Sequence, residues 1–356
     1  LADDGYLVLP AFAEPHAHLD KAFLAERVDN PTGDLMGAIE AMELHRDSIT
    51  VADTIQRAER AARLLAANGC TAIRTHADLT LACGLNSVGA LIEVRRRLRD
   101  VVDIQIAALC AWPSIGTEGA DQRALLREAI AMGIDVVGGC SYLESDPAAA
   151  NDSLLTIAAE AGLPVDLHTD ETLDPSVLTL EDLAERVVSS GFPHSVTASH
   201  CVSLSMQPES RQREVAEKVA AAGMSVIALP HTNLFLQGRN HQVAMPRAVT
   251  AVKALWGAGV NVAAGADNLQ DPFNPVGRGD PLETAALMVM VAHTLPADAL
   301  HMITEAPRRA MGLPPCTDHV AVRAATVREA IAFCPADRVL VRGAVAAPAT
   351  AGPGRA

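Results

Sequence analysis

Short apolar runs rich in β-branched residues recur along the chain and alternate with stretches of helical periodicity. Such runs predict buried strands, whereas apolar residues spaced three and four apart predict amphipathic helices. The predicted strands are Tyr6–Glu14, Thr71–His76, Val101–Cys110, Ile134–Cys140, Pro164–His168, Ser195–Cys201, Ser225–Leu229 and Val260–Gly265. The clearest helices between them are Thr54–Ala67, Gln122–Met132, Ser153–Ala161, Leu180–Ser189, Arg211–Ala222 and Arg247–Trp256.

Repeated units of strand, helix and closing glycine are typical of a (β/α)8 barrel. Gly162 and Gly191, for example, stand where a helix is expected to end. A doubly wound open sheet is the main alternative, but the even spacing of the units and the polar residues at several strand ends favour the closed barrel. We therefore expect a barrel over residues 1–312, with two further helices at Pro281–His293 and Ala299–Met311.

A small flanking segment is expected over residues 313–356. Its strand-like pieces, Val320–Val322 and Arg338–Val345, are too short to form an independent sheet. The Ala/Pro/Gly-rich tail from Ala344 onward predicts a frayed end. Because the chain starts almost at the first predicted strand, we expect this flanking β structure to be incomplete and Arg338–Val345 to lack some of its partners.

Composition narrows the class of protein. The 356 residues are 49% apolar with few aromatics, which suits an α/β protein with a large core. The net charge of −15 disfavours nucleic acid and anionic membranes as partners. Seven cysteines without a Cys-x-x-Cys pair, and no leader-like or membrane-spanning apolar stretch, predict a reduced cytoplasmic protein. The sequence is compatible with a homo-oligomer.

Polar residues follow several of the predicted strands. His16 and His18 follow the first strand and are separated by one residue, so their side chains point the same way. The fifth, sixth and eighth strands end in His168, His200 and Asp267. In a barrel all of these strand ends open on one face. Three imidazoles and a carboxylate form a suitable ligand set for one Zn²⁺ or Fe²⁺ with a water in an open position.

A metal of this kind lowers the pKa of its bound water to about 7, which provides hydroxide at neutral pH. Asp267 could take the proton of that water, and Glu171, three residues beyond His168, could deliver protons to a leaving nitrogen. These groups are the ones needed to remove an amine from a ring carbon by hydrolysis.

Four motifs carry a resemblance to a known family. They are Glu14-Pro15-His16-Ala17-His18-Leu19-Asp20, His168-Thr169-Asp170-Glu171, Thr197-Ala198-Ser199-His200 and Leu236-Gln237-Gly238-Arg239. Together they resemble the amidohydrolase superfamily, in particular its bacterial cytosine deaminase branch, from about Leu7 to Leu313.

The resemblance implies a distorted barrel with one iron or zinc ion. It implies His16, His18, His168 and Asp267 as metal ligands. It further implies Glu171 as the proton shuttle and His200 as a hydrogen-bond partner of the metal-bound water. The fourth strand ends in Gly138-Gly139-Cys140 and offers no lysine to bridge two metals, so we expect a single metal.

The motifs depart from the cytosine deaminase branch around the expected substrate. Ser114 stands where that branch has a glutamine, Asn268 where it has a second aspartate, and Phe273 where it has a tryptophan. Asp267-Asn268 and the stretch from His18 to Phe23 are more similar to the N-isopropylammelide hydrolase branch. We take Trp112, Ser114, Asn268 and Phe273 as candidate substrate-binding residues.

These observations predict a metal-dependent hydrolytic deaminase of a cytosine-like nitrogen heterocycle, in which hydroxide attacks the amino-bearing carbon and ammonia leaves. Three alternatives remain open: release of an alkylamine from an aminotriazine-like ring, hydrolysis of a cyclic amide, and a barrel that binds a heterocycle without turnover. Beside the site, we expect His76 to support the ligands and Lys21 to pair with Asp20.

Overall fold

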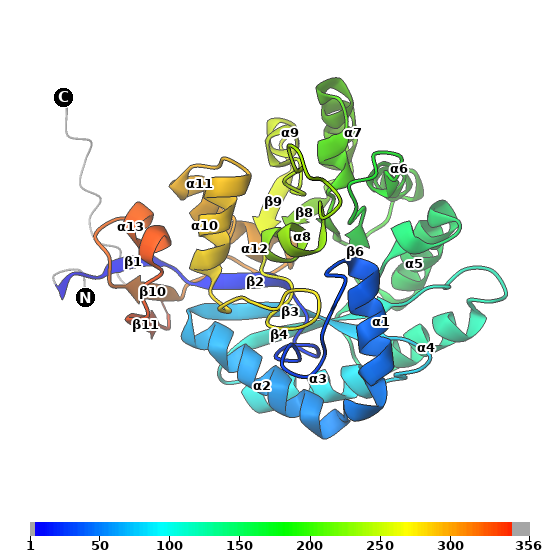
Figure 1. Cartoon of the computed structure of the whole chain (residues 1–356), viewed down its shortest axis with the longest axis horizontal. Helices are drawn as coiled ribbons and strands as arrows, with labels where there is room; N and C mark the ends of the chain where they lie inside the picture. The colour runs from blue at the N-terminus through cyan, green and yellow to red at the C-terminus, as the bar shows by residue number, and fades with distance from the viewer. Residues whose placement is uncertain (1–3, 344–356) are drawn as a thin grey trace.

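The computed structural model describes residues 4–343, and within them eight strands form a barrel (Figure 1). The barrel strands are β2 (Phe12–Ala17), β3 (Cys70–Leu79), β4 (Asp103–Cys110), β5 (Val136–Gly139), β6 (Val165–Thr169), β7 (Val196–His200), β8 (Ser225–Ala228) and β9 (Asn261–Ala264). They lie in chain order, and each pairs with the next in parallel. The predicted barrel is confirmed.

The barrel is nearly closed by contacts between its first strand and the segment that follows β9. The amide of Asp267 donates to the carbonyl of His16 at 3.0 Å, and the amide of His18 donates to the carbonyl of Asp267 at 3.1 Å. Two candidate metal ligands on one side of the barrel are therefore tied by the backbone to a third, which is far away in the sequence.

The first predicted strand is two strands, and this corrects the sequence interpretation. Strand β1 (Leu7–Pro10) pairs with β10 (His319–Val322) in a separate antiparallel sheet, whereas β2 belongs to the barrel. The change occurs at Ala11, whose amide donates to the backbone carbonyl of Asp318, whereas the amide of Phe12 donates to the backbone carbonyl of Gly69. A change of pairing partner within a continuous apolar run leaves no mark in the hydrophobic pattern.

The small sheet also provides a partner for the last described strand. Strand β11 (Arg338–Val341) pairs antiparallel with β10 and lies at the edge of this sheet, so residues 338–341 have one strand partner. The expected frayed tail lies outside the described residues. In Figure 1 this sheet and α13 (Val327–Phe333) lie together beside the barrel.

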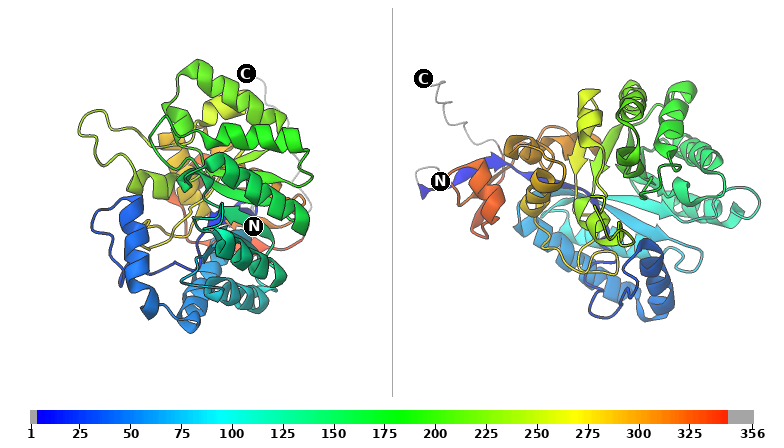
Figure 2. Two further views of the ribbon diagram at one scale, coloured as in Figure 1. Left: turned by 90° about the vertical axis from the view of Figure 1, so that its right-hand side faces the viewer. Right: turned by 45° about the horizontal axis from the view of Figure 1, so that its top comes forward.

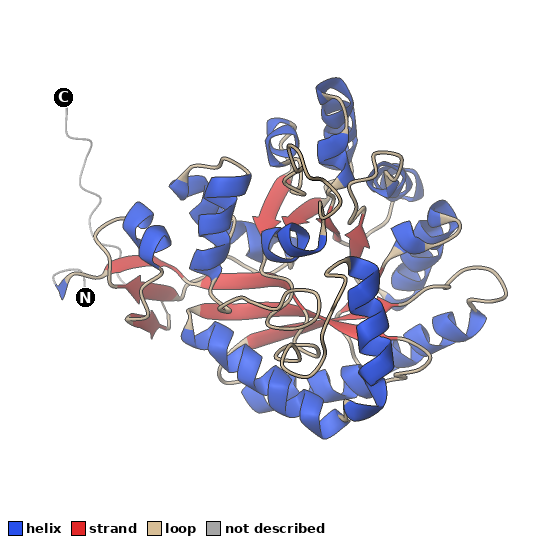
Figure 3. Ribbon diagram, in the orientation of Figure 1, coloured by secondary structure: helices blue, strands red, loops and turns tan. Residues whose placement is uncertain are grey.

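Helices surround the barrel strands (Figures 2 and 3). They are α1 (Leu35–His45), α2 (Val51–Ala67), α3 (Asn86–Leu98), α4 (Ala120–Ala131), α5 (Pro147–Ala161), α6 (Thr179–Ser190), α7 (Glu209–Ala221), α8 (Pro230–Leu236), α9 (Val252–Gly257), α10 (Pro281–Val291), α11 (Pro296–His301) and α12 (Glu305–Ala310). Gly162 and Gly191 end α5 and α6 in the left-handed conformation, with φ of 69° and 62°. Among the described residues, no helix combines the length and apolar character needed to cross a bilayer.

Two predicted helices differ from the structure. The stretch predicted at Arg247–Trp256 is helical only from Val252, because the preceding residues form a loop in which the Thr250 hydroxyl donates to the carbonyl of His200. The stretch predicted at Ala299–Met311 is divided between α11 and α12. The long helix α1, which the apolar pattern did not predict, lies in the loop after the first barrel strand.

Candidate metal centre and active site

The candidate metal ligands meet at the carboxyl ends of the barrel strands. His16 lies in β2, His18 directly follows it, His168 lies in β6, and Asp267 follows β9. One possible ligand atom from each of the four residues lies within 4.8 Å of those of the others, and all four residues are buried. The convergence expected from the strand ends is therefore present, although these residues are spread over most of the sequence.

The separations of these atoms fit a shared metal ion. Nε2 of His18 lies 3.1 Å from Nε2 of His168 and 3.3 Å from Oδ1 of Asp267, and Nε2 of His16 lies 3.5 Å from the same oxygen. Ligand atoms at about 2.0–2.2 Å from a tetrahedral metal are about 3.3–3.6 Å apart. The spacing therefore matches a single tetrahedral or related centre.

Unsatisfied atoms and charge state also fit a metal. Nε2 of His16 and both carboxylate oxygens of Asp267 are buried without a hydrogen-bond partner in the described structure. Burial, followed by the neighbouring imidazoles, holds the pKa of His16 and of His168 well below the usual value, so both rings are neutral at pH 7. Burial raises the pKa of Asp267, but His18 and His200 outweigh it and lower that pKa overall. Neutral imidazoles beside an ionised carboxylate form a donor set suited to a divalent cation.

A hydrogen-bonded chain behind His16 fixes the orientation of its ring. Nδ1 of His16 lies 2.9 Å from Oγ of Ser199, and the Ser199 hydroxyl donates to Oδ1 of Asp166 at 2.9 Å. Asp166 is in turn paired with Arg74 at 2.8 Å. Because the only hydroxyl proton of Ser199 goes to Asp166, its oxygen must accept from Nδ1–H of His16. The lone pair of Nε2 then faces the metal position.

His76 lies beneath this centre, as expected of a supporting residue. Its ring stacks on that of His16 with centroids 4.0 Å apart, and its Nε2 lies 3.8 Å from Asp166. His16, His76 and Asp166 form a second group that could hold a metal. The carboxylate of Asp166 is already bound by Arg74 and Ser199, which makes it a poorer metal ligand than the unpaired carboxylate of Asp267.

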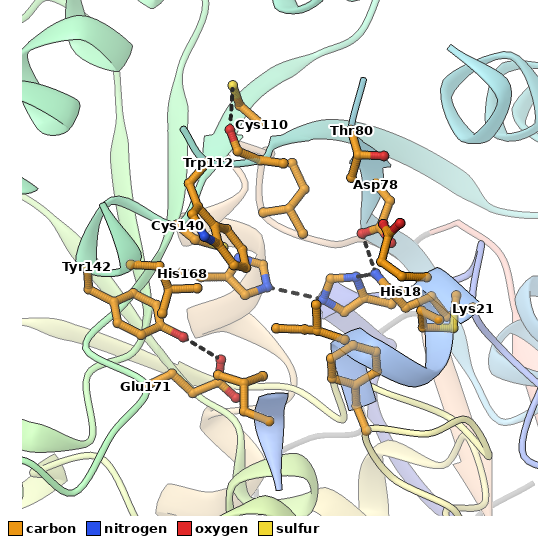
Figure 4. Close-up of a pocket in the computed structure, with 18 of the residues that line it drawn as sticks. His18, Lys21, Asp78, Thr80, Cys110, Trp112, Cys140, Tyr142, His168 and Glu171 are labelled. Atoms are coloured by element: carbon orange, nitrogen blue, oxygen red, sulfur yellow. Dashed lines mark hydrogen bonds and ion pairs between the residues drawn. The ribbon is translucent and has the colours of Figure 1, made fainter. Parts of the chain in front are cut away.

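Glu171 and His200 lie on one side of the candidate centre (Figure 4 shows Glu171). Nε2 of His200 is 3.6 Å from Oε2 of Glu171 and 3.9 Å from Oδ2 of Asp267. Burial raises the pKa of Glu171, and His200 partly opposes this shift. Both side chains therefore border the candidate centre on the same side.

Two residues that the sequence analysis did not select hold these groups. Tyr142, in the short helix η3 (Ser141–Leu143) after β5, donates its hydroxyl to Oε2 of Glu171 at 3.2 Å. Asn233, in α8, lies with Oδ1 2.9 Å from Nδ1 of His200. Their position just after barrel strands was the only signal in the sequence, and many other polar residues share it.

A cavity of about 460 Å³ opens onto the candidate centre. Trp112, Asn268 and Phe273 line it, as the sequence analysis expected, but Ser114 does not. Ser114 is buried, and its hydroxyl and amide both donate to Oε1 of Glu144 at 2.6 Å. Its selection as a substrate-binding residue is corrected on this ground, since its hydroxyl is directed away from the cavity.

The side chain of Asn268 is engaged by protein groups. Its Oδ1 accepts from the Thr232 hydroxyl at 3.2 Å, and its Nδ2 donates to Asp271 at 2.7 Å. Asn268 therefore shapes the cavity wall with its amide already satisfied on both ends.

Lys21 is the one cation among the residues that line the cavity within the described chain. Its Nζ lies 2.6 Å from Oδ1 of Asp78, 2.9 Å from Nδ1 of His18 and 3.9 Å from Oδ1 of Asp20. The expected pairing with Asp20 is present, but Asp78 is the closer partner. These contacts hold the first loop beside the candidate ligand His18.

Helix α1 forms an apolar wall of the cavity. Leu35, Ile39 and Met42, which share one face of this helix, line the cavity together with the neighbouring Glu43. In Figure 1 the helix lies in front of the barrel strands. The sequence analysis did not predict this part of the cavity wall.

Residues 24–316 match the amidohydrolase family. The chain belongs to this family. It is 38% identical over 315 residues to a pterin deaminase of Rhizobium rhizogenes, a match that covers 86% of this chain and 71% of that protein. It is 24% identical over 297 residues to an N-isopropylammelide isopropyl amidohydrolase of a Pseudomonas species, covering 80% of this chain and 68% of that one.

Two solved amidohydrolase structures are also similar to this chain. One is a 5-methylcytosine deaminase of Klebsiella pneumoniae, with a TM-score of 0.87, 31% identity and coverage of 99% of this chain and 89% of that chain. The other is an N-isopropylammelide isopropylaminohydrolase of Burkholderia multivorans, with a TM-score of 0.80, 30% identity and coverage of 95% and 86%.

The expected superfamily, barrel fold and enzyme class are thus confirmed. The chain is an amidohydrolase, an enzyme that hydrolyses C–N bonds, and its relatives include deaminases. Its buried His/Asp group agrees with the metal dependence of this family.

Proposed function

We propose that this amidohydrolase removes an amino group from a nitrogen heterocycle by hydrolysis and releases ammonia. One observation carries the proposal: three members of the candidate metal group, His18, His168 and Asp267, line the same cavity as Glu171 and His200, and the fourth, His16, lies buried behind them. Nothing else in the described part of the chain combines buried metal-ligating and proton-transferring side chains with an open cavity.

We assign His16, His18, His168 and Asp267 to one zinc or iron ion. A divalent metal bound there supplies a water of lowered pKa, and thus a nucleophile at neutral pH. A second metal is disfavoured because β5 ends in Gly138-Gly139, without a bridging lysine, and because Asp166 is neutralised by Arg74.

The proton-transferring groups act from one side of the cavity. Glu171, in its ionised form, receives a proton from the incoming water and delivers it to the ring nitrogen beside the reacting carbon. Asp267 takes the second proton of the water, which ends on the departing amine. His200, whose Nδ1 faces Oδ1 of Asn233, uses its Nε2 to accept a hydrogen bond from the attacking water. The balance is one exocyclic bond broken between the ring carbon and its amino nitrogen, one C–O bond formed and one ammonia released.

The cavity favours a ring system larger than a single pyrimidine. Its volume of about 460 Å³ falls within the range of about 300–1,000 Å³ found for pockets that enclose drug-sized molecules. The apolar wall from α1 and the aromatic rings of Trp112 and Phe273 suit a flat bicyclic ring. The similarity to a pterin deaminase supports the same choice. We therefore favour a pterin-type amino-oxo heterocycle over the cytosine-like ring expected from the sequence.

The test is product release by zinc- or iron-loaded protein on pterin, 5-methylcytosine, cytosine and N-isopropylammelide, with metal content measured in parallel. We expect ammonia from pterin at the highest kcat/KM, and about one metal per chain. Release of isopropylamine alone would overturn the deaminase assignment, and ammonia only from the pyrimidines would overturn the preference for two rings.

Glu171→Gln is the matched catalytic control. The variant keeps the size of the side chain and the candidate metal ligands, but cannot carry a proton. We expect kcat to fall by about 10²- to 10⁴-fold at unchanged metal content. Wild-type rates in this variant would remove Glu171 from the proposed mechanism.

A further inference from the structure

Tyr142 contacts the proposed proton shuttle from the opposite side to the candidate metal. It lies in η3, directly after the carboxyl end of β5, and lines the cavity. Its hydroxyl donates to Oε2 of Glu171 at 3.2 Å, and Figure 4 shows the phenol directed at the carboxylate. The sequence analysis gave this residue no role, and the mechanism above does not use it.

The two oxygens of Glu171 are in different situations. Oε2 receives the Tyr142 hydroxyl and also lies 3.6 Å from Nε2 of His200. Oε1 has no hydrogen-bond partner among residues 4–343. One oxygen is therefore held by the protein while the other is left for substrate.

The charged and titratable groups that act on Glu171 come from several elements. His200 ends β7, Asp267 follows β9, His18 follows β2, and Tyr142 approaches from η3. Of these, the Tyr142 hydroxyl is the only neutral donor in hydrogen-bond contact with the carboxylate in the described structure. A hydrogen bond of this kind favours the ionised form of an acid.

We propose that Tyr142 is a positioning residue for proton transfer: by binding Oε2 it fixes the carboxylate of Glu171 so that Oε1 faces the reacting ring. This inference rests on the proposed function. The hydroxyl also stabilises the ionised carboxylate between the two proton transfers, in a site where burial opposes charge. Glu171 can then accept a proton from water and pass it on without leaving its place.

The competing explanation is purely structural. A buried tyrosine hydroxyl needs a hydrogen-bond partner, and Glu171 could serve only that purpose. Removal of a hydroxyl with only a structural role would lower stability or metal content and leave kcat per bound metal unchanged. A fall of kcat at unchanged metal content, together with the shift of the pH profile, separates the two roles.

Tyr142→Phe removes only the hydroxyl, and Tyr6→Phe is the matched control. Tyr6 is the other of the two tyrosines in the chain, and its hydroxyl also donates to a carboxylate, Asp337, at 2.7 Å in the flanking region. For Tyr142→Phe we expect kcat to fall by about 10- to 100-fold with little change in KM and in metal content. For Tyr6→Phe we expect the wild-type kcat.

The acid limb of kcat/KM should move in a defined direction. Loss of a donor to the carboxylate raises the pKa of Glu171, so the acid limb should shift upward by about one pH unit in Tyr142→Phe and stay in place in Tyr6→Phe. An unchanged acid limb, or a loss of activity equal at every pH and accompanied by loss of metal, would overturn the positioning role.

A second measurement keeps this test separate from the substrate assignment. The carboxyl resonance of Glu171 can be titrated by ¹³C NMR in the zinc-loaded protein and assigned with Glu171→Gln. An upward shift of its midpoint in Tyr142→Phe supports the inference even when none of the four rings is a substrate, which would refute the proposed function alone. An unshifted midpoint would refute the inference while leaving the deaminase assignment intact.

Discussion

Ser199 illustrates how a single hydroxyl can determine the tautomer of a candidate metal ligand. Its hydroxyl accepts a hydrogen bond from Nδ1 of His16 and donates one to Asp166, and this keeps the lone pair of His16 Nε2 directed at the candidate metal position. We expect Ser199→Ala to weaken zinc binding by about 10- to 100-fold, the effect typical of a lost hydrogen bond to a metal-ligating histidine. Competition with a chromophoric chelator measures this directly.

Ser205→Ala is the control for that prediction. Ser205 follows the same strand in η4 (Ser203–Met206), and its hydroxyl donates to the backbone carbonyl of Val202 at 2.8 Å. The Ser205→Ala substitution removes a similar hydrogen bond that lies away from the metal position, so zinc affinity should stay at the wild-type value. Equal affinities in both variants would mean that Ser199 does not orient His16.

Some residues of the candidate site could be predicted from their position at strand ends, whereas others depend on contacts between distant parts of the chain. His16, His18, His168 and Asp267 could be predicted because each stands at a strand end and barrel geometry alone brings strand ends together. The role of Tyr142 depends on a contact with Glu171, 29 positions away, and on the path of two loops. Periodicity carries no information on such contacts.

Ser114 failed as a prediction for a related reason. Its place in the chain suggested that it lines the cavity, but its hydroxyl and amide both donate hydrogen bonds to the carboxylate of Glu144. A polar residue after a barrel strand can thus face a neighbouring loop as readily as the substrate.

At the scale of elements, strands were easier to predict than helices. A fully buried parallel strand is a compact apolar run, and all eight barrel strands overlap their predicted ranges. Helix α1 was missed because its apolar residues face both an open cavity and the first loop, where Ala41 packs with Leu24 and Val28, and this blurs the alternation with polar positions. The division between β1 and β2 was missed because a change of pairing partner does not alter hydropathy.

The wall formed by α1 should discriminate between ring sizes. Ile39 lines the cavity, so Ile39→Ala removes apolar contact with whatever part of the substrate extends away from the metal. We expect KM for pterin to rise by about 10-fold, the value of a few methylene contacts in an apolar pocket, and KM for 5-methylcytosine to change much less. Steady-state kinetics on both rings measures the difference.

Met36 provides the control on the same helix. It is 49% exposed and does not line the cavity, so Met36→Ala changes the helix without changing the wall. Both KM values should remain at wild type. A proportional rise of KM for both rings in Ile39→Ala would show that α1 does not contact the second ring.

At the scale of the whole molecule, the flanking sheet is linked to the barrel by a buried ion pair. The guanidinium of Arg338, in β11, makes two hydrogen bonds to Asp280, at 2.8 and 2.6 Å, and both side chains are almost fully buried. Asp280 also caps the first turn of α10 by accepting from the amide of Leu282 at 3.0 Å. Arg338 further donates to the carbonyl of Asn68, at the end of α2.

Removal of this arginine should destabilise the fold strongly. Arg338→Ala leaves the carboxylate of Asp280 buried beside the helix without its cation, which typically costs about 3–5 kcal/mol of unfolding free energy. Arg323→Ala breaks the exposed pair with Asp337 and the exposed contacts of Arg323 with Asp4 and Tyr6, and should cost at most about 1 kcal/mol. Urea unfolding of the zinc-loaded proteins measures both values.

The double variant Arg338→Met/Asp280→Asn distinguishes the buried charge from lost packing. Without either charge, the desolvation penalty disappears, so the double variant should be more stable than Arg338→Ala, although the cap on α10 is weakened. Equal stability of Arg338→Ala and Arg323→Ala would mean that the flanking sheet is held by its apolar contacts alone. Because Arg338 and Asp280 lie outside the catalytic cavity, kcat of the folded fraction should match the wild type in every case.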